Sequence, residues 1–187
     1  MAQLLPFRDY DEHDVINLFA FDYAGTTVTK GALVKIKASA GWNVAQELDQ
    51  SNSMVGFTLN NVVSDRYAVS ARVSLAGSGD NPLGMMLYDV AETDENGEKL
   101  IYNPRKAAEM QTTVSGQAVP ILTKGIVLVN GVDGTVAEGG LAYCGTGSAD
   151  GGITATAGGT KKKIGRFLGT TGANGEVLLH LDVNIDL

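Results

Sequence analysis

The sequence predicts an all-β protein: a small β-barrel or sandwich with an inserted β-hairpin and short helix, and an extended arm at the N-terminus. Glycine supplies 24 of the 187 residues, well above the usual share of ~7%, which is typical of a chain that turns often. Apolar and polar residues alternate in several short runs, which is the pattern of half-buried strands. The helical stretch is short and covers residues 104–110.

The composition is that of an acidic protein that can bury a core. Hydrophobic residues make up 44% of the chain, and the formal net charge is −7. This charge argues against general binding to nucleic acid or anionic membranes, because phosphate contacts need clustered Lys and Arg. No run approaches the ~18 apolar residues of a membrane span, and no signal peptide is visible. The single cysteine, Cys144, excludes an internal disulfide, so we expect synthesis in a cytoplasm.

Residues 1–24 form the predicted N-terminal arm. Four carboxylates crowd around His13, and an apolar run then extends from Val15 to Phe21. This run is too short for its period to distinguish a strand from a helix. We interpret the arm as a segment that packs on another surface, for example that of a neighbouring subunit, and its candidate contact residues are Val15, Ile16, Leu18, Phe19 and Phe21.

Residues 25–82 predict a first group of short strands. Within residues 32–38, Val34 and Ile36 face inward and the neighbouring lysines face outward. Two further alternating runs, 55–59 and 67–75, predict strands, and the second has the cleaner pattern.

Residues 83–118 predict an inserted hairpin followed by a helix. The run from Leu83 to Val90 is apolar, and Asn96 and Gly97 give a strong two-residue turn signal. Residues 99–102 would then return as the second strand. Pro104 is tolerated in the first turn of a helix, so we expect a helix of about two turns after it.

Residues 119–187 predict a second group of strands, at 121–122, 125–129, 140–143 and 176–183. A weak internal repeat links the two groups, because residues 164–167 echo 55–57 and the strand near Val177 echoes the one near Val69 at nearly the same offset. Two arrangements therefore stay open: one β-rich domain over 25–187, or two related β-units at 25–82 and 119–187.

The residues that could carry chemistry form no recognisable catalytic signature. His13 and its carboxylates are competent ligands for a divalent cation, but their spacing matches no calcium loop. Cys144 has no associated histidine signature that would activate it. The glycine clusters lack the Lys-Ser/Thr ending of a phosphate-binding loop. We therefore expect no catalytic, cofactor-binding or metal-binding residues.

The basic run Lys161, Lys162 and Lys163 stands out in an acidic chain. Its simplest interpretation is a solvated loop. The alternative is a docking loop that binds an acidic surface on a partner, and these three lysines are the second group of candidate contact residues.

Several segments together resemble a known family. The run 123–129 is followed by 139–143, and residues 164–169 then precede a glycine-rich turn and the alternating strand of 172–181. The first half adds residues 56–59 and 67–77. In this order the segments resemble the head decoration (cement) proteins of tailed bacteriophages, and they are similar to lambda-type relatives. The arm, the hairpin and the helix lie outside the minimal pattern.

The resemblance implies a virion structural protein without catalytic residues. It implies binding to the outer surface of the capsid, where subunits bridge neighbouring major capsid proteins and resist the pressure of packaged DNA. It also implies self-association as a homo-oligomer, which in lambda-type relatives is a trimer, with no direct contact to nucleic acid or membrane. On this hypothesis a protein without residues 1–24 would still fold but would no longer attach to shells.

Other functions also fit a β-rich chain. A tail-tube or minor head protein has a similar composition, and residues 83–102 could supply the long hairpin that closes a tube. A carbohydrate-binding module would need exposed aromatic residues clustered on one sheet face, whereas Trp42 is the single tryptophan and the other aromatics are spread thinly.

Overall fold

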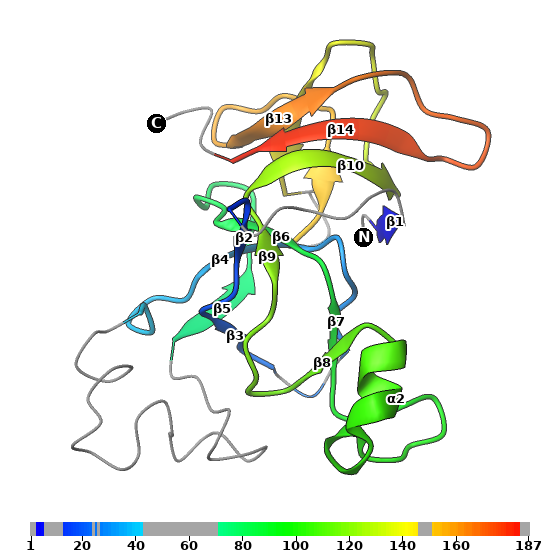
Figure 1. Cartoon of the computed structure of the whole chain (residues 1–187). Coiled ribbons are helices and arrows are strands. Elements are labelled where there is room, and N and C mark those ends of the chain that lie inside the picture. Colours follow the sequence, from blue (N-terminus) through cyan, green and yellow to red (C-terminus); the bar gives the residue numbers. More distant parts are fainter. Residues whose placement is uncertain are drawn as a thin grey trace.

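The computed structural model describes residues 3–5, 13–23, 25, 27–42, 71–145 and 151–183. Within these ranges the chain forms two six-stranded sheets, one two-stranded sheet, one α-helix and one 3-10 helix. In Figure 1 the first sheet lies at the top, the second lies below it, and the helix lies at the end farthest from the first sheet. The prediction of an all-β fold is confirmed.

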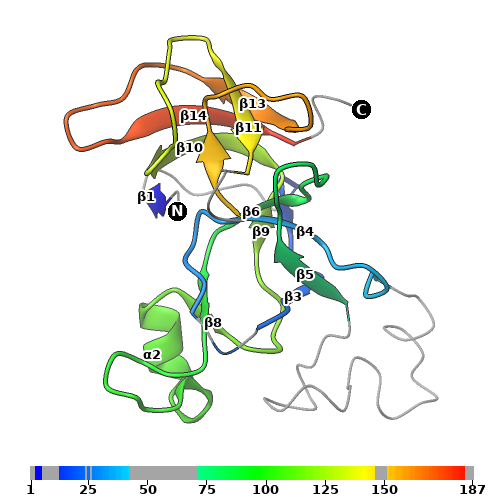
Figure 2. The ribbon, with the colours of Figure 1, turned by 180° about the vertical axis from the view of Figure 1, so that it is seen from behind.

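Sheet 1 is built mainly from the C-terminal third of the chain and is curled (Figure 2). Its long central strands have alternating burial, so Val127, Val129, Leu179 and Leu181 point into the core. Neighbouring strands are antiparallel. In spatial order the strands are β1 (Gln3–Leu5), β10 (Lys124–Asn130), β14 (Val177–Asp182), β13 (Lys163–Phe167), β11 (Leu141–Cys144) and β12 (Ile153–Thr154).

Sheet 2 is the middle layer of the molecule and packs against a core on each of its two faces. Successive side chains of a strand point to opposite faces, so Met85 packs into the core shared with sheet 1, while Met86 packs into a second core on the far side. In spatial order its strands are β2 (Val15–Ile16), β9 (Ile121–Leu122), β6 (Gly84–Met86), β4 (Leu33–Ile36), β5 (Arg72–Leu75) and β3 (Ala20–Phe21).

The two sheets share one core. Leu33, Met85 and Leu122 from sheet 2 belong to the same buried cluster as Phe167 and Leu179 from sheet 1. The chain passes from β9 to β10 through Thr123 alone, so the two sheets are held together covalently as well as by packing. The proposed repeat between the halves stays a prediction, since residues 55–57 and Val69 lie outside the described residues, as do the predicted strand 55–59 and the first part of 67–75.

The described parts of the arm contain three short strands, which join the protein's own sheets. Strand β1 pairs with β10, β2 pairs with β9, and β3 pairs in parallel with β5. The Leu4 nitrogen donates a hydrogen bond to the Lys30 carbonyl oxygen at 3.3 Å. A Cβ at the neighbouring Gly31 would overlap the backbone of Leu4. Glycine at this position therefore lets the arm lie directly on the chain.

The inserted segment differs from the expected hairpin. The turn forms, because Thr93 pairs with Lys99 in an antiparallel bridge, but the returning residues wind into the 3-10 helix η1 (Leu100–Tyr102). Strands β6 and β7 (Asp89–Ala91) pair with different partners, and β7 instead lies parallel to β8 (Thr112–Val114). The predicted returning strand at residues 99–102 is therefore wrong, and residues 83–102 do not form the long hairpin that the tail-tube alternative would need.

A small core explains this difference. The buried Leu100 packs with Ala91, Ala107 and Val114, an arrangement that joins η1 to helix α2 (Pro104–Glu109) and to the β7–β8 pair. The 3-10 conformation of η1 places Leu100 in this core. We infer that a strand at the same residues would have kept pairing with the residues before the turn and would not have buried Leu100. The expected helix after Pro104 is confirmed. We call residues 89–117 the helical module.

Candidate partner-binding surface

The structure separates the five arm candidates into buried and exposed residues. Phe19 and Phe21 are each only 6% exposed and belong to the core behind sheet 2. Val15 and Ile16 are half-buried and pack against the two cores. Leu18 is 52% exposed, so of these five candidates it offers the most apolar surface to a partner.

The lysine run lies at the start of strand β13 in sheet 1, whereas the arm strands β2 and β3 belong to sheet 2. Lys161 and Lys162 precede β13, and Lys163 is its first residue. Lys162 is exposed, whereas Lys161 and Lys163 are half-buried. The Lys161 ammonium donates a hydrogen bond to the Thr156 carbonyl oxygen at 3.1 Å. The structure therefore does not combine the two groups of candidates into one site.

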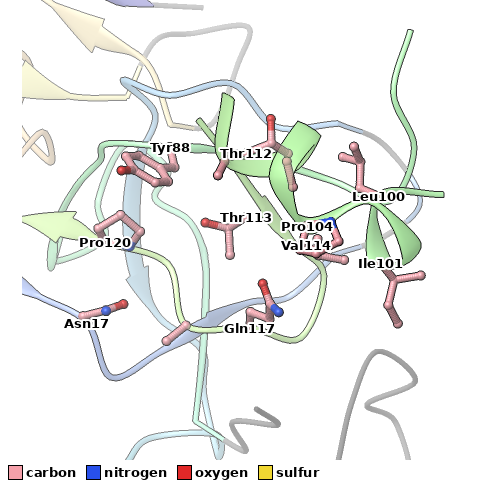
Figure 3. A pocket seen from close by; sticks show the side chains of 13 residues that line it. Asn17, Tyr88, Leu100, Ile101, Pro104, Thr112, Thr113, Val114, Gln117 and Pro120 are labelled. Atoms are coloured by element: carbon pink, nitrogen blue, oxygen red, sulfur yellow. The ribbon is translucent and has the colours of Figure 1, made fainter. Parts of the chain in front are cut away.

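A pocket of about 700 Å³ lies between the arm and the helical module. Figure 3 shows Asn17, Tyr88 and Pro120 along one side and the residues of η1 and α2 along the other. Strand β8 and residues 117–118 after it also line the pocket. The residues that line it are Asn17, Tyr88, Leu100, Ile101, Pro104, Ala107, Ala108, Thr112, Thr113, Val114, Gln117, Ala118 and Pro120.

The pocket combines apolar walls with unused hydrogen-bonding groups. None of its lining residues is charged. Thr113 is 7% exposed, and within the described part of the chain its hydroxyl has no hydrogen-bond partner. The same holds for the side-chain amides of Asn17 and Gln117 and for the Tyr88 hydroxyl, among the residues that the structure places.

Two tyrosines in the segments around the pocket are exposed. Tyr88 is 40% exposed at its edge, and Tyr102, which directly follows the lining residue Ile101, is 78% exposed. Tyrosine is enriched in protein interfaces. Sequence reasoning missed this site because its residues come from separate segments of the chain. The polar Asn17 inside the apolar run of the arm is the signal that could have indicated it.

Comparison with known families decides the class of the protein. A family model described as structural cement protein (E217 gp24/Pam3 gp6) matches residues 9–182. This chain belongs to that family of phage structural cement proteins. The match spans sheet 2, the helical module and every strand of sheet 1 except β1, and it confirms the resemblance to decoration (cement) proteins. No curated protein matches the chain.

Membership makes the cement protein a structural component of the phage virion that is associated with the capsid shell. A structural cement family also points to a non-enzymatic role. Among the described residues, no group of three or more His, Cys, Asp and Glu side chains could hold a metal ion. Within the same ranges, no helix is long and apolar enough to cross a membrane.

An ion pair fixes the helical module that borders the pocket of the cement protein. The Asp94 side chain is fully buried and pairs with the ammonium of Lys106 on α2. Its carboxylate also accepts hydrogen bonds from the Asn96 and Glu98 backbone nitrogens, each at 2.8 Å. The Lys106 hydrogen bond lowers the pKa of Asp94, with a smaller contribution from the two backbone donors. The same pair raises the pKa of Lys106.

We expect Asp94→Asn to destabilise the cement protein most at neutral pH. The lowered pKa of Asp94 means that its contribution to folding is complete above the ordinary carboxyl pKa of ~3.9 and is lost as the pH falls through the lower folded value. Melting temperatures of wild type and variant should therefore differ clearly at pH 7, and the difference should shrink as the pH falls below ~3.9. A variant of the exposed neighbour, Glu95→Gln, is the control and should change little. Equal melting temperatures at pH 7 would contradict the role of Asp94.

Proposed function

We propose that this cement protein binds the outer surface of a bacteriophage capsid and stabilises the shell by bridging neighbouring major capsid subunits. The observation that carries the proposal is the family match over residues 9–182. The rigid body formed by two sheets with a common core supports it, because a bridge resists shell expansion only if it does not itself deform.

Two surfaces are proposed to contact the shell. Leu18, with the half-buried Val15 and Ile16, provides apolar contact on the arm, while Phe19 and Phe21 hold the arm in place from the core. The lysine run 161–163 provides a basic docking loop for an acidic patch. Because these surfaces lie on different sheets, they suit contacts with two different subunits.

Many copies on one lattice would then hold tightly even if each contact is weak. A second contact made by an already bound molecule is intramolecular and gains from effective concentration. Self-association as a homo-oligomer, with a trimer as the form seen in lambda-type relatives, would add to this gain. We include it in the proposal.

The test is co-sedimentation of the purified protein with undecorated capsid shells, together with its mass in solution by light scattering. Saturable binding at a fixed ratio to shell subunits, and shells that then resist heating better, is the expected result. The mass in solution reports whether the protein arrives as a monomer or preassembled. Failure to sediment with shells, or assembly into tubes or rings, would overturn the proposal.

We expect neutralising the lysine run to weaken shell binding. Exposed ion pairs contribute ~0.2–1 kcal/mol each, so replacing Lys161, Lys162 and Lys163 by Gln should lower the affinity roughly 3- to 160-fold. The salt dependence of binding should also become smaller. Sedimentation at several salt concentrations measures both.

The control for this variant changes three exposed basic residues elsewhere, namely Lys37, Lys99 and Arg105, to Gln. It alters the net charge by the same amount. If both triple variants lose the same affinity, the effect comes from overall charge and the lysine run has no docking role.

A further inference from the structure

We propose that the pocket between the arm and the helical module binds an extended, uncharged segment of the major capsid protein, which adds as a strand beside β8. We call it the Thr113 pocket. This inference rests on the proposed function, and it names the place and the kind of segment that would be recognised.

Thr113 is the first observation. A buried hydroxyl without a hydrogen-bond partner is unfavourable for a folded protein. Thr113 is 7% exposed, and its hydroxyl has no partner in the described part of the chain. The adjacent Thr112 is equally buried but donates a hydrogen bond to the Met110 carbonyl oxygen at 3.4 Å. The hydroxyl of Thr113 faces the pocket region in Figure 3, so a ligand there can supply the missing partner.

The edge of β8 is the second observation. Side chains of a strand alternate between two faces, yet the consecutive residues Thr112, Thr113 and Val114 all line the pocket. The pocket therefore runs along the edge of this strand. Among the described strands, β8 pairs only with β7. Within the described residues β8 is thus an edge strand beside a pocket, which is the geometry of peptide recognition by strand addition, in which main-chain hydrogen bonds give affinity. The Val114 carbonyl oxygen of β8 already accepts a hydrogen bond from the Gln117 nitrogen at 3.1 Å, so an added strand would use other main-chain groups of β8.

The remaining polar groups match the chemistry of a peptide backbone. Each peptide unit presents one donor and one acceptor. The side-chain amides of Asn17 and Gln117 each offer both, as does the Tyr88 hydroxyl at the rim. These groups come from three separate segments and converge on one pocket.

The walls determine which segment fits. They carry no charged side chain, so a carboxylate, a phosphate or a nucleic-acid backbone would find no countercharge there. The apolar residues of η1 and α2 instead offer contacts to small or apolar side chains. The major capsid protein is the occupant to which we commit, because a cement protein works in association with the capsid shell.

The first variant removes the hydroxyl and keeps the shape. Thr113→Val should lower the affinity for undecorated shells roughly 2- to 10-fold, the effect of losing one hydrogen bond. Its melting temperature should be unchanged or raised, because the unpartnered hydroxyl is gone. Thr171→Val makes the same chemical change at an exposed position between β13 and β14 and should leave both quantities unchanged.

The second variant fills the pocket. Ala108 is exposed on α2 and lines the pocket, so Ala108→Trp should block entry and reduce shell binding more strongly than Thr113→Val. A photo-crosslinking amino acid at position 108, followed by mass spectrometry of protein bound to shells, identifies the occupant. The expected crosslinks fall within one short linear segment of the major capsid protein.

The outcomes separate this inference from the proposed function. If wild type binds shells but Thr113→Val and Ala108→Trp bind equally well, the Thr113 pocket has no docking role while the proposed function stands. Crosslinks to a second copy of the cement protein, or to a small molecule, would also overturn the inference. So would a melting temperature of Thr113→Val that falls together with its affinity, because Thr113 would then be structural. Failure of wild type to bind shells overturns both proposals.

Discussion

Deleting residues 1–24 should unfold much of the cement protein instead of leaving a folded domain that has only lost its attachment. The described parts of the arm supply three edge strands, to both sheets. They also bury Leu4, Phe19 and Phe21. At ~1.5–3 kcal/mol for each large apolar side chain, these three contribute roughly 5–9 kcal/mol. Because the whole stability of a domain is ~5–15 kcal/mol, the truncated protein should show loss of cooperative unfolding in urea.

Point variants separate the structural part of the arm from its binding part. Phe21→Ala should lower the free energy of unfolding by about 3–5 kcal/mol, as expected for a buried phenylalanine. Leu18→Ala should change it by less than ~0.5 kcal/mol, since Leu18 is 52% exposed, but should weaken binding to shells. A truncated protein that unfolds cooperatively at the urea concentration of wild type would show that the arm does not belong to the core.

A strand was predictable from the sequence where its alternation of apolar and polar residues matches the alternation of buried and exposed side chains in the fold. The alternation in residues 176–183 matches β14 because one face of sheet 1 covers the core and the other does not. The helix after Pro104 follows from local preference alone. The returning strand at 99–102 was not predictable as η1, because what decides it is Leu100 packing against Ala107 and Val114, which are contacts between separate segments.

The arm shows how far sequence reasoning reaches for the site. Its apolar run predicts a segment that packs on another surface, but a run in isolation does not reveal whether that surface belongs to another molecule or to the same chain. Parallel pairing of β3 with β5 joins residues about fifty positions apart, and no local signal encodes that contact. The Thr113 pocket was missed for the same reason: Thr113, Asn17 and Gln117 are unremarkable residues until the fold brings them together.

Gly84→Ala should be among the most damaging single substitutions in the protein. Gly84 lies in β6, next to β9 on one side and β4 on the other. A Cβ here would overlap the Leu122 carbonyl oxygen and lie 2.7 Å from the Ile121 Cγ2 atom. Since β6 packs through Met85 and Met86 into the cores on both faces of sheet 2, it has little room to shift. We expect a loss of about 3 kcal/mol or more, measured by urea unfolding.

Gly159→Ala is the matched control, because a Cβ at this position meets nothing within 4 Å, and it should change stability by less than ~0.5 kcal/mol. The damage at Gly84 should also spread beyond sheet 2. The added methyl group would displace β9, and β9 is joined to β10 of sheet 1 through Thr123 alone. We therefore expect amide hydrogen exchange in Gly84→Ala to become faster in both sheets. Faster exchange confined to sheet 2 would mean that the sheets respond separately. Such uncoupled sheets would also weaken the proposed bridging function, because a bridge between two capsid subunits must transmit force from one sheet to the other through the shared core.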